Sequence, residues 1–271
     1  MSVDFLQAFK RAIAFCIEPK RWLPFFIIDL AFISAALFLI FQNMEYFIYI
    51  IMAAESPEML VPLVNTLLTI IGLFIGWVLV TLWVTGAVIH QSYKEKEFAK
   101  SWGVSAGRYL SLLGVLMITG IISFAVSMIP YVGWIIAILF SLVFLFTLQS
   151  VVISKSGIIS AIRDSWKIFR KKPFHVFLMW LIISAFSLIL LLVFALPLLA
   201  LTINTLWNVL GIYGGSFQTI DAGSLVSLAI AVKNQLSLFI LSGAILLVGL
   251  AIVRAFSLKA QTEFYLQIKK K

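Results

Sequence analysis

Six long apolar stretches dominate the pattern of hydrophobic and polar residues along the chain. A transmembrane helix needs about 20 mainly apolar residues to cross about 30 Å of hydrocarbon, and each stretch is long enough. The stretches cover residues 22–41, 59–89, 109–129, 131–153, 174–201 and 235–257. The pattern therefore predicts an all-α fold, a polytopic transmembrane bundle with six spans that forms a single integral membrane domain over residues 1–271.

Amphipathic basic segments precede three of these spans, at about residues 4–18, 98–108 and 156–172. In the last of them Ile158, Ile162 and Trp166 recur at helical spacing between basic residues, which is typical of a helix that lies at the membrane surface. We predict three cytoplasmic interfacial helices. The dipeptide Ser-Trp occurs in two of them, so the chain either repeats one unit three times or contains segments that are alike only in composition.

The connections on the opposite side of the predicted spans differ in length. Residues 129–133 leave almost no loop between the third and fourth spans, because Pro130 ends a helix. Residues 45–54 and 225–232 belong to longer connections that are still apolar. These two segments either lie on the membrane surface, re-enter the membrane or extend the neighbouring helices.

The overall composition excludes a water-soluble protein. Hydrophobic residues make up 63% of the chain and charged residues 11%, whereas a typical soluble domain has about 45–50% and about 25%. A soluble protein of this length has too little interior to bury so much apolar surface. The segments between the spans are also too short for a separate catalytic domain, which usually needs about 50 residues or more.

The basic residues are distributed asymmetrically. Of the 20 Lys and Arg residues, 19 lie on one side of the predicted spans and only Lys233 lies on the other. Lys and Arg residues near span ends are retained on the cytoplasmic face. We therefore expect a multi-pass protein of the plasma (inner) membrane with its N- and C-termini in the cytoplasm.

Topology accounts for most of this charge, and contact with lipid headgroups is a second use for it. Each basic residue near an anionic membrane surface adds about 1 kcal/mol of attraction. The candidate headgroup contacts are Lys10, Arg11, Lys20, Arg21, Arg163, Lys167, Arg170, Lys171 and Lys172. Because the basic residues are dispersed over several membrane-tethered segments, we do not expect nucleic-acid binding.

Ionisable residues inside the predicted spans are rare, and two of them could meet. Asp29 lies in the first span and Arg254 in the last, both toward the cytoplasmic side. Charges in hydrocarbon are expensive unless they are paired, and Arg is suited to a carboxylate partner. Asp29 and Arg254 are a candidate intramembrane ion pair if the first and last spans are neighbours. The pair would either brace the bundle or form a proton- or ion-sensitive site, and the alternative is that the Arg254 side chain extends to the membrane surface.

Signatures of catalysis and of metal binding are missing from the sequence. There is no H-E-x-x-H, G-x-S-x-G or P-loop motif. His90, His175 and Cys16 lack the spacing of zinc ligands. We expect no catalytic residue, no metal site and no cofactor, and we predict that the protein is not an enzyme.

Two short motifs carry a resemblance to known membrane proteins. The segment Ala161-Ile-Arg-Asp-Ser165-Trp166, followed by Arg170 and Lys171, joins the fourth and fifth predicted spans, and Ile129-Pro130-Tyr-Val-Gly133 joins the third and fourth. In these motifs and in its layout the chain resembles prokaryotic six-span proteins similar to the membrane domain of glycerophosphoryl diester phosphodiesterases. The resemblance implies an integral membrane protein of unassigned activity. The chain departs from the phosphodiesterases themselves, because its spans are not followed by a catalytic domain.

The predicted spans contain few polar residues that could line a path for a solute. We therefore expect a non-enzymatic protein that interacts with lipids or serves as a scaffold or accessory protein. The alternative is a transporter or channel for a small solute or ion, built around the charged pair. A midplane cavity lined by polar residues such as Asn65 or Ser184 would favour transport, and a lateral groove would favour lipid. The expected partners are membrane lipids, with other membrane proteins or a second copy of the chain as further options.

Overall fold

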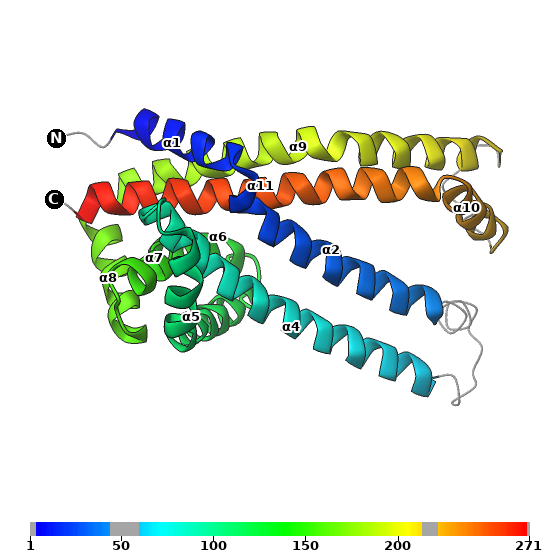
Figure 1. Ribbon diagram of the computed structural model, residues 1–271. Helices are drawn as coiled ribbons and strands as arrows, with labels where there is room; N and C mark the ends of the chain where they lie inside the picture. The colour runs from blue at the N-terminus through cyan, green and yellow to red at the C-terminus, as the bar shows by residue number, and fades with distance from the viewer. Residues whose placement is uncertain (1–3, 44–59, 213–221, 270–271) are drawn as a thin grey trace.

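The computed structural model describes residues 4–43, 60–212 and 222–269. Within these residues every regular element is a helix (Figure 1). Six helical segments are long and apolar enough to cross a membrane. The predicted all-α polytopic bundle is therefore confirmed.

The spanning segments follow the predicted order along the chain. They are α2 (Pro19–Gln42), α4 (Leu60–Tyr93), α5 (Phe98–Ser127), α6 (Gly133–Val143) with α7 (Thr147–Ile153), α9 (Pro173–Ile212) and α11 (Leu236–Lys269). The last two are much longer than the apolar stretches that predicted them. In α11 the added residues include Lys259 and Glu263, which continue the helix because they are buried against neighbouring helices, as described below.

Two of the three predicted interfacial helices are separate elements, and one prediction was wrong. The separate helices are α1 (Phe5–Ile17) and α8 (Ile158–Lys171). Residues 98–108 are instead the first turns of α5, which continues without a break to Ser127. No proline interrupts this helix, and its small residues pack closely on α4, where the Ser105 hydroxyl donates to the Trp83 carbonyl at 2.6 Å.

The fourth span is broken between α6 and α7, at Phe144–Phe146. Ser165 of α8 forms hydrogen bonds with backbone groups at this break. Its hydroxyl donates to the Val143 carbonyl at 2.5 Å and accepts from the Phe146 amide at 3.2 Å. Buried backbone groups need such partners, so the Ser of this Ser-Trp dipeptide fixes α8 against the break.

The connections opposite the chain termini are only partly described. Residues 225–232 lie within a separate helix, α10 (Ala222–Asn234), which leads into α11. The segment 45–54 lies outside the described residues. In Figure 1 α10 lies at the end opposite the termini, and α2 and α4 point away from α9 and α11 toward that end.

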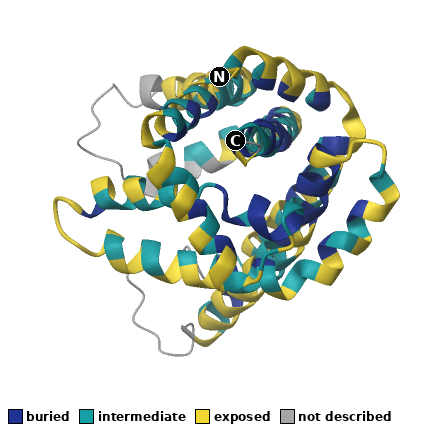
Figure 2. Ribbon diagram, turned by 90° about the vertical axis from the view of Figure 1, so that its left-hand side faces the viewer, coloured by how far each residue is buried: buried dark blue, intermediate teal, exposed yellow. Residues whose placement is uncertain are grey.

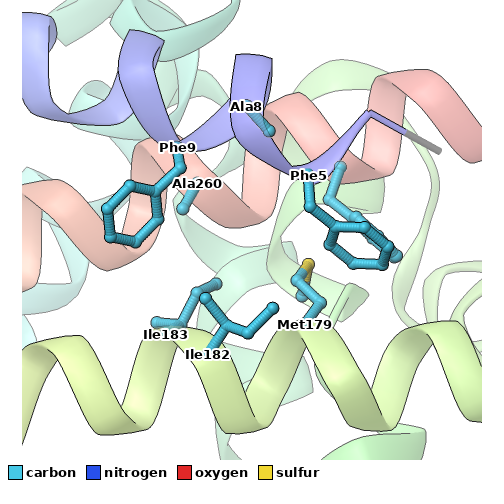
Figure 3. A pocket seen from close by; sticks show the side chains of 8 residues that line it. Phe5, Ala8, Phe9, Met179, Ile182, Ile183 and Ala260 are labelled. Atoms are coloured by element: carbon cyan, nitrogen blue, oxygen red, sulfur yellow. The ribbon is translucent and has the colours of Figure 1, made fainter.

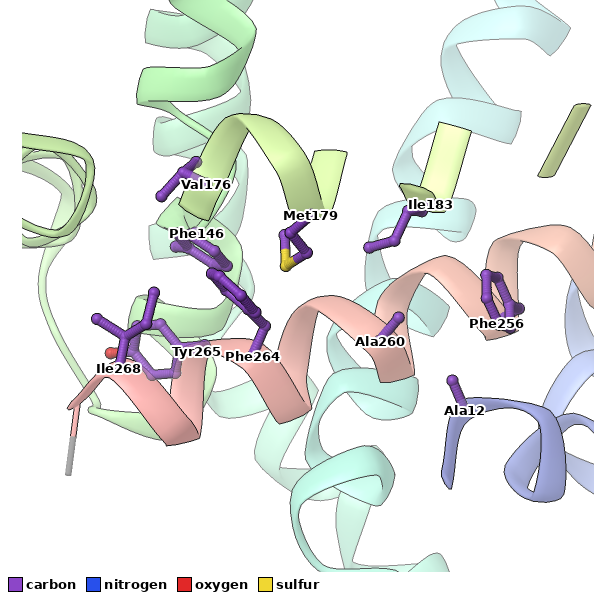
Figure 4. Close-up of a cluster of buried hydrophobic side chains, with 10 residues drawn as sticks. All are labelled: Ala12, Phe146, Val176, Met179, Ile183, Phe256, Ala260, Phe264, Tyr265 and Ile268. Atoms are coloured by element: carbon purple, nitrogen blue, oxygen red, sulfur yellow. The ribbon is translucent and has the colours of Figure 1, made fainter. Parts of the chain in front are cut away.

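Buried residues are concentrated toward the end of the bundle that holds both termini. Figure 2 shows the molecule from that end, coloured by burial. The largest apolar cluster joins α1, α7, α9 and α11 and includes Ala12, Phe146, Met179, Phe256 and Phe264 (Figure 4). By contrast, only 11% of the most apolar part of α2, of α4 and of α5 is buried. The rest of these helices presents apolar side chains to the surroundings, as membrane spans do.

Candidate functional site

The predicted pair of intramembrane charges is present in the structure. Arg254 of α11 donates through Nη1 to both carboxylate oxygens of Asp29 of α2, at 2.9 Å each. The indole of Trp77 on α4 donates to Asp29 Oδ1 at 2.8 Å. Three spans therefore meet at one carboxylate.

The two partners of this pair differ in burial. The Asp29 side chain is 4% exposed, and the Arg254 side chain is 31% exposed. The guanidinium carbon lies 5.4 Å from the ring centre of Trp77 and 5.9 Å from that of Phe25. A buried carboxylate is stable only when its charge is matched. Arg254 and Trp77 satisfy Asp29, and the arrangement braces α2, α4 and α11.

A second charged network lies nearer the termini and was not predicted. Lys259 of α11 is 2% exposed, and its ammonium group contacts Glu95 and Glu263 at 2.7 Å each. It also donates to the Ser92 carbonyl at 2.8 Å. All three partners are acceptors, so each of the three N–H donors of the buried ammonium group has a partner within the protein.

Arg21 belongs to the same network, and its prediction as a headgroup contact was wrong. Its side chain is 2% exposed and donates to Glu18 at 3.1 Å and to the Glu95 carbonyl at 3.1 Å. The Phe15 ring lies between the two buried cations, 4.8 Å from the Arg21 guanidinium and 5.5 Å from the Lys259 ammonium. The guanidinium is thus enclosed by acceptors and aromatic rings and cannot reach a lipid headgroup.

A sequence signal for this network exists. Lys259 and Glu263 are four residues apart and form an i,i+4 ion pair on one face of a helix. That spacing indicates that the helix continues beyond the apolar stretch ending at residue 257. The segment 90–97 has the composition of a solvated turn, and only the tertiary structure brings Glu95 to Lys259.

The other eight candidate headgroup contacts lie at the surface of α1, the start of α2 and α8. Lys172 is half-buried and the others are exposed. Two of these eight residues have acidic partners, since Arg11 contacts Glu263 at 3.0 Å and Lys20 contacts Glu18 at 3.0 Å. The positions on α8 lie beside Trp166, which is 46% exposed.

A basic groove of about 210 Å³ separates α8 from the end of α11. It is lined by Asp164, Lys167, Ile168, Lys171, Tyr265, Ile268 and Lys269. The Asp164 carboxylate accepts hydrogen bonds from Ser150 and Ser156 at 3.1 Å each. The Tyr265 and Ser154 hydroxyls share a hydrogen bond of 2.5 Å, and Lys269 donates to the same Ser154 hydroxyl. Two candidate headgroup contacts, Lys167 and Lys171, thus face one hollow together with Lys269.

Two further hollows are apolar and lie along α1, α9 and α11. The larger, about 270 Å³, is lined by Ile13, Cys16, Phe186, Phe194 and Phe256 among others. The smaller, about 20 Å³, lies where Phe5 and Phe9 of α1 point toward α9 and α11 (Figure 3). Asn65, Thr66, Ser184 and Ser187 line none of these three hollows.

The histidines and the single cysteine are not brought together. Phe5 stacks on His175 at 6.3 Å between ring centres, whereas His90 is buried in α4. The Cys16 thiol approaches the Ile252 carbonyl at 3.8 Å, and burial raises its pKa to about 12. Among the described residues no three His, Cys, Asp or Glu side chains gather where they could hold a metal ion.

Comparison with known proteins gives a family and no activity. No curated protein and no solved structure matches the chain significantly. Residues 129–268, which run from the turn before α6 to the end of α11, match the model of DUF7847, a domain of unknown function. This matched region contains α8, Arg254 and every residue that lines the basic groove except Lys269. The chain therefore belongs to the DUF7847 family.

Proposed function

We propose that the protein is a non-enzymatic, lipid-interacting or scaffold protein of the plasma (inner) membrane, with both termini in the cytoplasm. The observation that carries the proposal is the charged surface at one end of the bundle. Exposed basic side chains of α1, α2 and α8 gather at the end that holds both described ends of the chain. Basic residues favour the cytoplasmic face, where the anionic leaflet attracts them.

The character of α8 supports contact with lipid at this surface. Its exposed side chains combine basic residues with apolar ones, including Trp166 at 46% and Ile159 at 70% exposure. A basic helix with an exposed Trp is typical of a segment at the boundary between headgroups and hydrocarbon. A helix that faced open water would gain nothing from exposing these apolar groups.

The apolar hollow beside α1 also favours lipid over a polar solute. The residues that line it are aliphatic and aromatic, apart from the Cys16 thiol. A path for ions or polar solutes is lined by carbonyls, charged rings or other polar groups. An apolar side hollow in a membrane span is suited to an acyl chain.

The lipid proposal is tested with the purified protein in nanodiscs that contain increasing fractions of phosphatidylglycerol in phosphatidylcholine. We expect the thermal unfolding midpoint to rise with the anionic fraction, because bound lipid stabilises the folded state. The rise should shrink in about 1 M salt, where the Debye length is about 3 Å. A midpoint that does not depend on the anionic fraction at low salt contradicts the proposal.

The orientation is tested separately with reporter fusions at the two ends of the chain. We expect green fluorescent protein to be fluorescent, and alkaline phosphatase to be inactive, at either terminus, since each reporter works on one side of the membrane only. Active alkaline phosphatase at either terminus would overturn the cytoplasmic assignment of that terminus.

A transporter or channel is the second candidate, and it is supported by the charged pair between α2 and α11. Charges inside spans often mark ion or proton pathways. Proteoliposomes loaded with a pH-sensitive dye test this alternative. The lipid proposal predicts that wild-type protein moves no more protons than empty liposomes do. A wild-type proton flux that Asp29→Asn abolishes would replace the lipid proposal with transport.

A further inference from the structure

The groove between α8 and α11 brings three ammonium groups to one hollow. Lys167 and Lys171 are four residues apart on α8, and Lys269 comes from the last turn of α11. Residues at this spacing share one face of a helix. The hollow is therefore bounded by basic side chains from two segments that lie about a hundred residues apart in the sequence.

The one carboxylate of the groove already has hydrogen-bond partners. Asp164 accepts two hydrogen bonds from Ser150 and Ser156. Lys167 and Lys171 form no hydrogen bond or ion pair within the described residues, and Lys269 binds only neutral groups, the Ser154 hydroxyl and the Tyr265 ring. Three lysines and one carboxylate leave a net charge of +2 in the hollow.

The surroundings of the groove place it at a lipid surface. Trp166 and Ile159 are exposed on the same helix, on a different face from the residues of α8 that line the groove, and Phe174 at the start of α9 is 69% exposed. These residues suit the headgroup boundary. The volume of about 210 Å³ is below the range of about 300–1,000 Å³ that encloses drug-sized ligands. It is therefore suited to a headgroup whose acyl chains remain in the bilayer.

We propose that this groove is a site for one anionic lipid whose headgroup is a phosphomonoester, as in phosphatidic acid. A phosphomonoester carries about −1.5 to −2 charge at neutral pH and offers three acceptor oxygens, which matches the net charge and the three ammonium donors. A phosphodiester headgroup carries one charge and leaves one ammonium group unmatched. Ammonium–phosphate hydrogen bonds are charge-assisted and short. The inference rests on the proposed lipid interaction and deepens it by naming the lipid class.

The competing explanation is that these lysines serve the fold alone. Lys171 and Lys269 lie in the last turns of their helices, where cations compensate the carbonyl ends of the helix dipole. This explanation predicts a small loss of stability on substitution and no change in lipid selectivity. Lipid selectivity is therefore the readout that separates the two.

The experiment compares the full-length wild type with two double variants of α8. Lys167→Gln with Lys171→Gln removes two charges that line the groove, and Arg163→Gln with Arg170→Gln removes two exposed charges that do not. Each protein is incorporated into nanodiscs of phosphatidylcholine with either phosphatidic acid or phosphatidylglycerol at equal total lipid charge. Native mass spectrometry then counts the lipids that remain bound.

We expect wild type to retain one phosphatidic acid, with a preference over phosphatidylglycerol of roughly fivefold or more. The preference should grow from about pH 5 to about pH 8, because the second phosphate pKa is about 6. It should disappear in the lysine variant and persist in the arginine variant. Equal thermal midpoints of both variants in detergent will show that the fold is intact.

Four results would overturn the assignment in different ways. Equal loss of the phosphatidic acid preference in both double variants would mean that the charged surface binds lipid diffusely. Equal retention of the two lipids by wild type would mean that the groove is not a site for a phosphomonoester. The proposed function stands in both cases. Full competition by millimolar inorganic phosphate would assign the groove to free phosphate. Indifference of wild type to all anionic lipid would instead contradict the proposed function itself.

Discussion

The two ends of this bundle use polar residues in opposite ways. At the end that holds the termini, polar and charged side chains from different helices are buried together, as Arg21 and Lys259 are. At the opposite end, Thr66, Thr69 and Thr202 each donate to the carbonyl four residues earlier in their own helix. No residue in 30–42, the second half of α2, is buried.

The difference follows from the two surroundings of the bundle, the hydrocarbon of the bilayer and the water near the headgroups. Lipid tails are as apolar as Leu, so the hydrophobic effect gives helices no drive to pack together within the bilayer. A Thr there satisfies itself within its own helix. Near the headgroups, water and charge are available, and a buried cation is tolerated only with a full set of acceptors. Specific tertiary structure is therefore concentrated at the basic end.

The largest expected effect comes from removing Lys259. Lys259→Met leaves Glu263, whose side chain is 9% exposed, with only the Arg11 contact, and breaking a buried pair costs about 3–5 kcal/mol. We expect a loss of about 3 kcal/mol in the free energy of unfolding, measured by denaturant titration in detergent. Lys10→Met, at an exposed position of α1, should change it by less than about 0.5 kcal/mol.

A second substitution shows whether the loss is due to an unpaired charge. Replacing Lys259 and Glu263 together by Met removes both charges, and we expect the double variant to be more stable than Lys259→Met alone. If the two variants are equally destabilised, packing rather than charge holds this end together.

The Asp29–Arg254 pair should respond unequally to the loss of each partner. Arg254→Gln leaves a carboxylate that is 4% exposed, whereas Asp29→Asn leaves a guanidinium that is 31% exposed. We expect Arg254→Gln to cost about 2–3 kcal/mol and Asp29→Asn about 1 kcal/mol, since removal of a charged hydrogen-bond partner costs more when the remaining group is buried. A double-mutant cycle in nanodiscs checks the coupling. Additive effects would mean that the pair does not brace the helices.

Two glycines of α4 offer the next comparison. A Cβ on Gly86 would collide with the Ser105 hydroxyl and lie 2.7 Å from Leu112 Cδ1, whereas a Cβ on Gly76 meets nothing within 4 Å. We expect Gly86→Ala to destabilise the protein by about 1–3 kcal/mol, because α4 and α5 must move apart. Gly76→Ala should be neutral or stabilising by up to about 1 kcal/mol. The unfolding midpoints in one detergent measure both, and equal effects would contradict the packing of α4 on α5.

These comparisons also show which features could be predicted from the sequence. The six spans follow from hydropathy, and the Asp29–Arg254 pair follows from the high cost of charge in hydrocarbon. The motif Gly72-x-x-x-Gly76 favours close helix approach, yet the close approach is made at Gly86. A GxxxG spacing marks a smooth helix face and does not say which helix covers it.

The buried charges and the broken span at the basic end could not be predicted from the sequence, for a physical reason. Lys259 and Glu263 have the composition of a polar tail, and only the folded structure encloses them with Glu95. The break at Phe144–Phe146 lies in an uninterrupted apolar run, so its signal is Ser165 in another helix. Long-range partners decide these features, and local patterns do not record them.

Cys16 lies where the two environments meet, and its reactivity gives the smallest and most local test. Its thiol lines the apolar hollow beside α1, and burial raises its pKa from 9.0 to about 12. Because the thiolate is the nucleophile, a raised pKa means that reaction becomes appreciable only as the pH approaches that value. We expect a charged thiosulfonate reagent at about pH 8 to modify Cys16 at least about tenfold more slowly than an exposed thiol.

The matched control moves the chain's one cysteine by two residues. Ala14→Cys in a Cys16→Ser background places the thiol at an exposed position of the same helix, and folding should be unchanged because serine is a small substitute. Mass spectrometry of the intact protein follows both reactions. Equal rates would mean that α1 leaves the bundle often enough to expose Cys16. The packed structure at the basic end would then not include α1. A slow rate for Cys16 alone extends that structure to the full length of α1, because the thiol is protected only while the helix stays packed on α11.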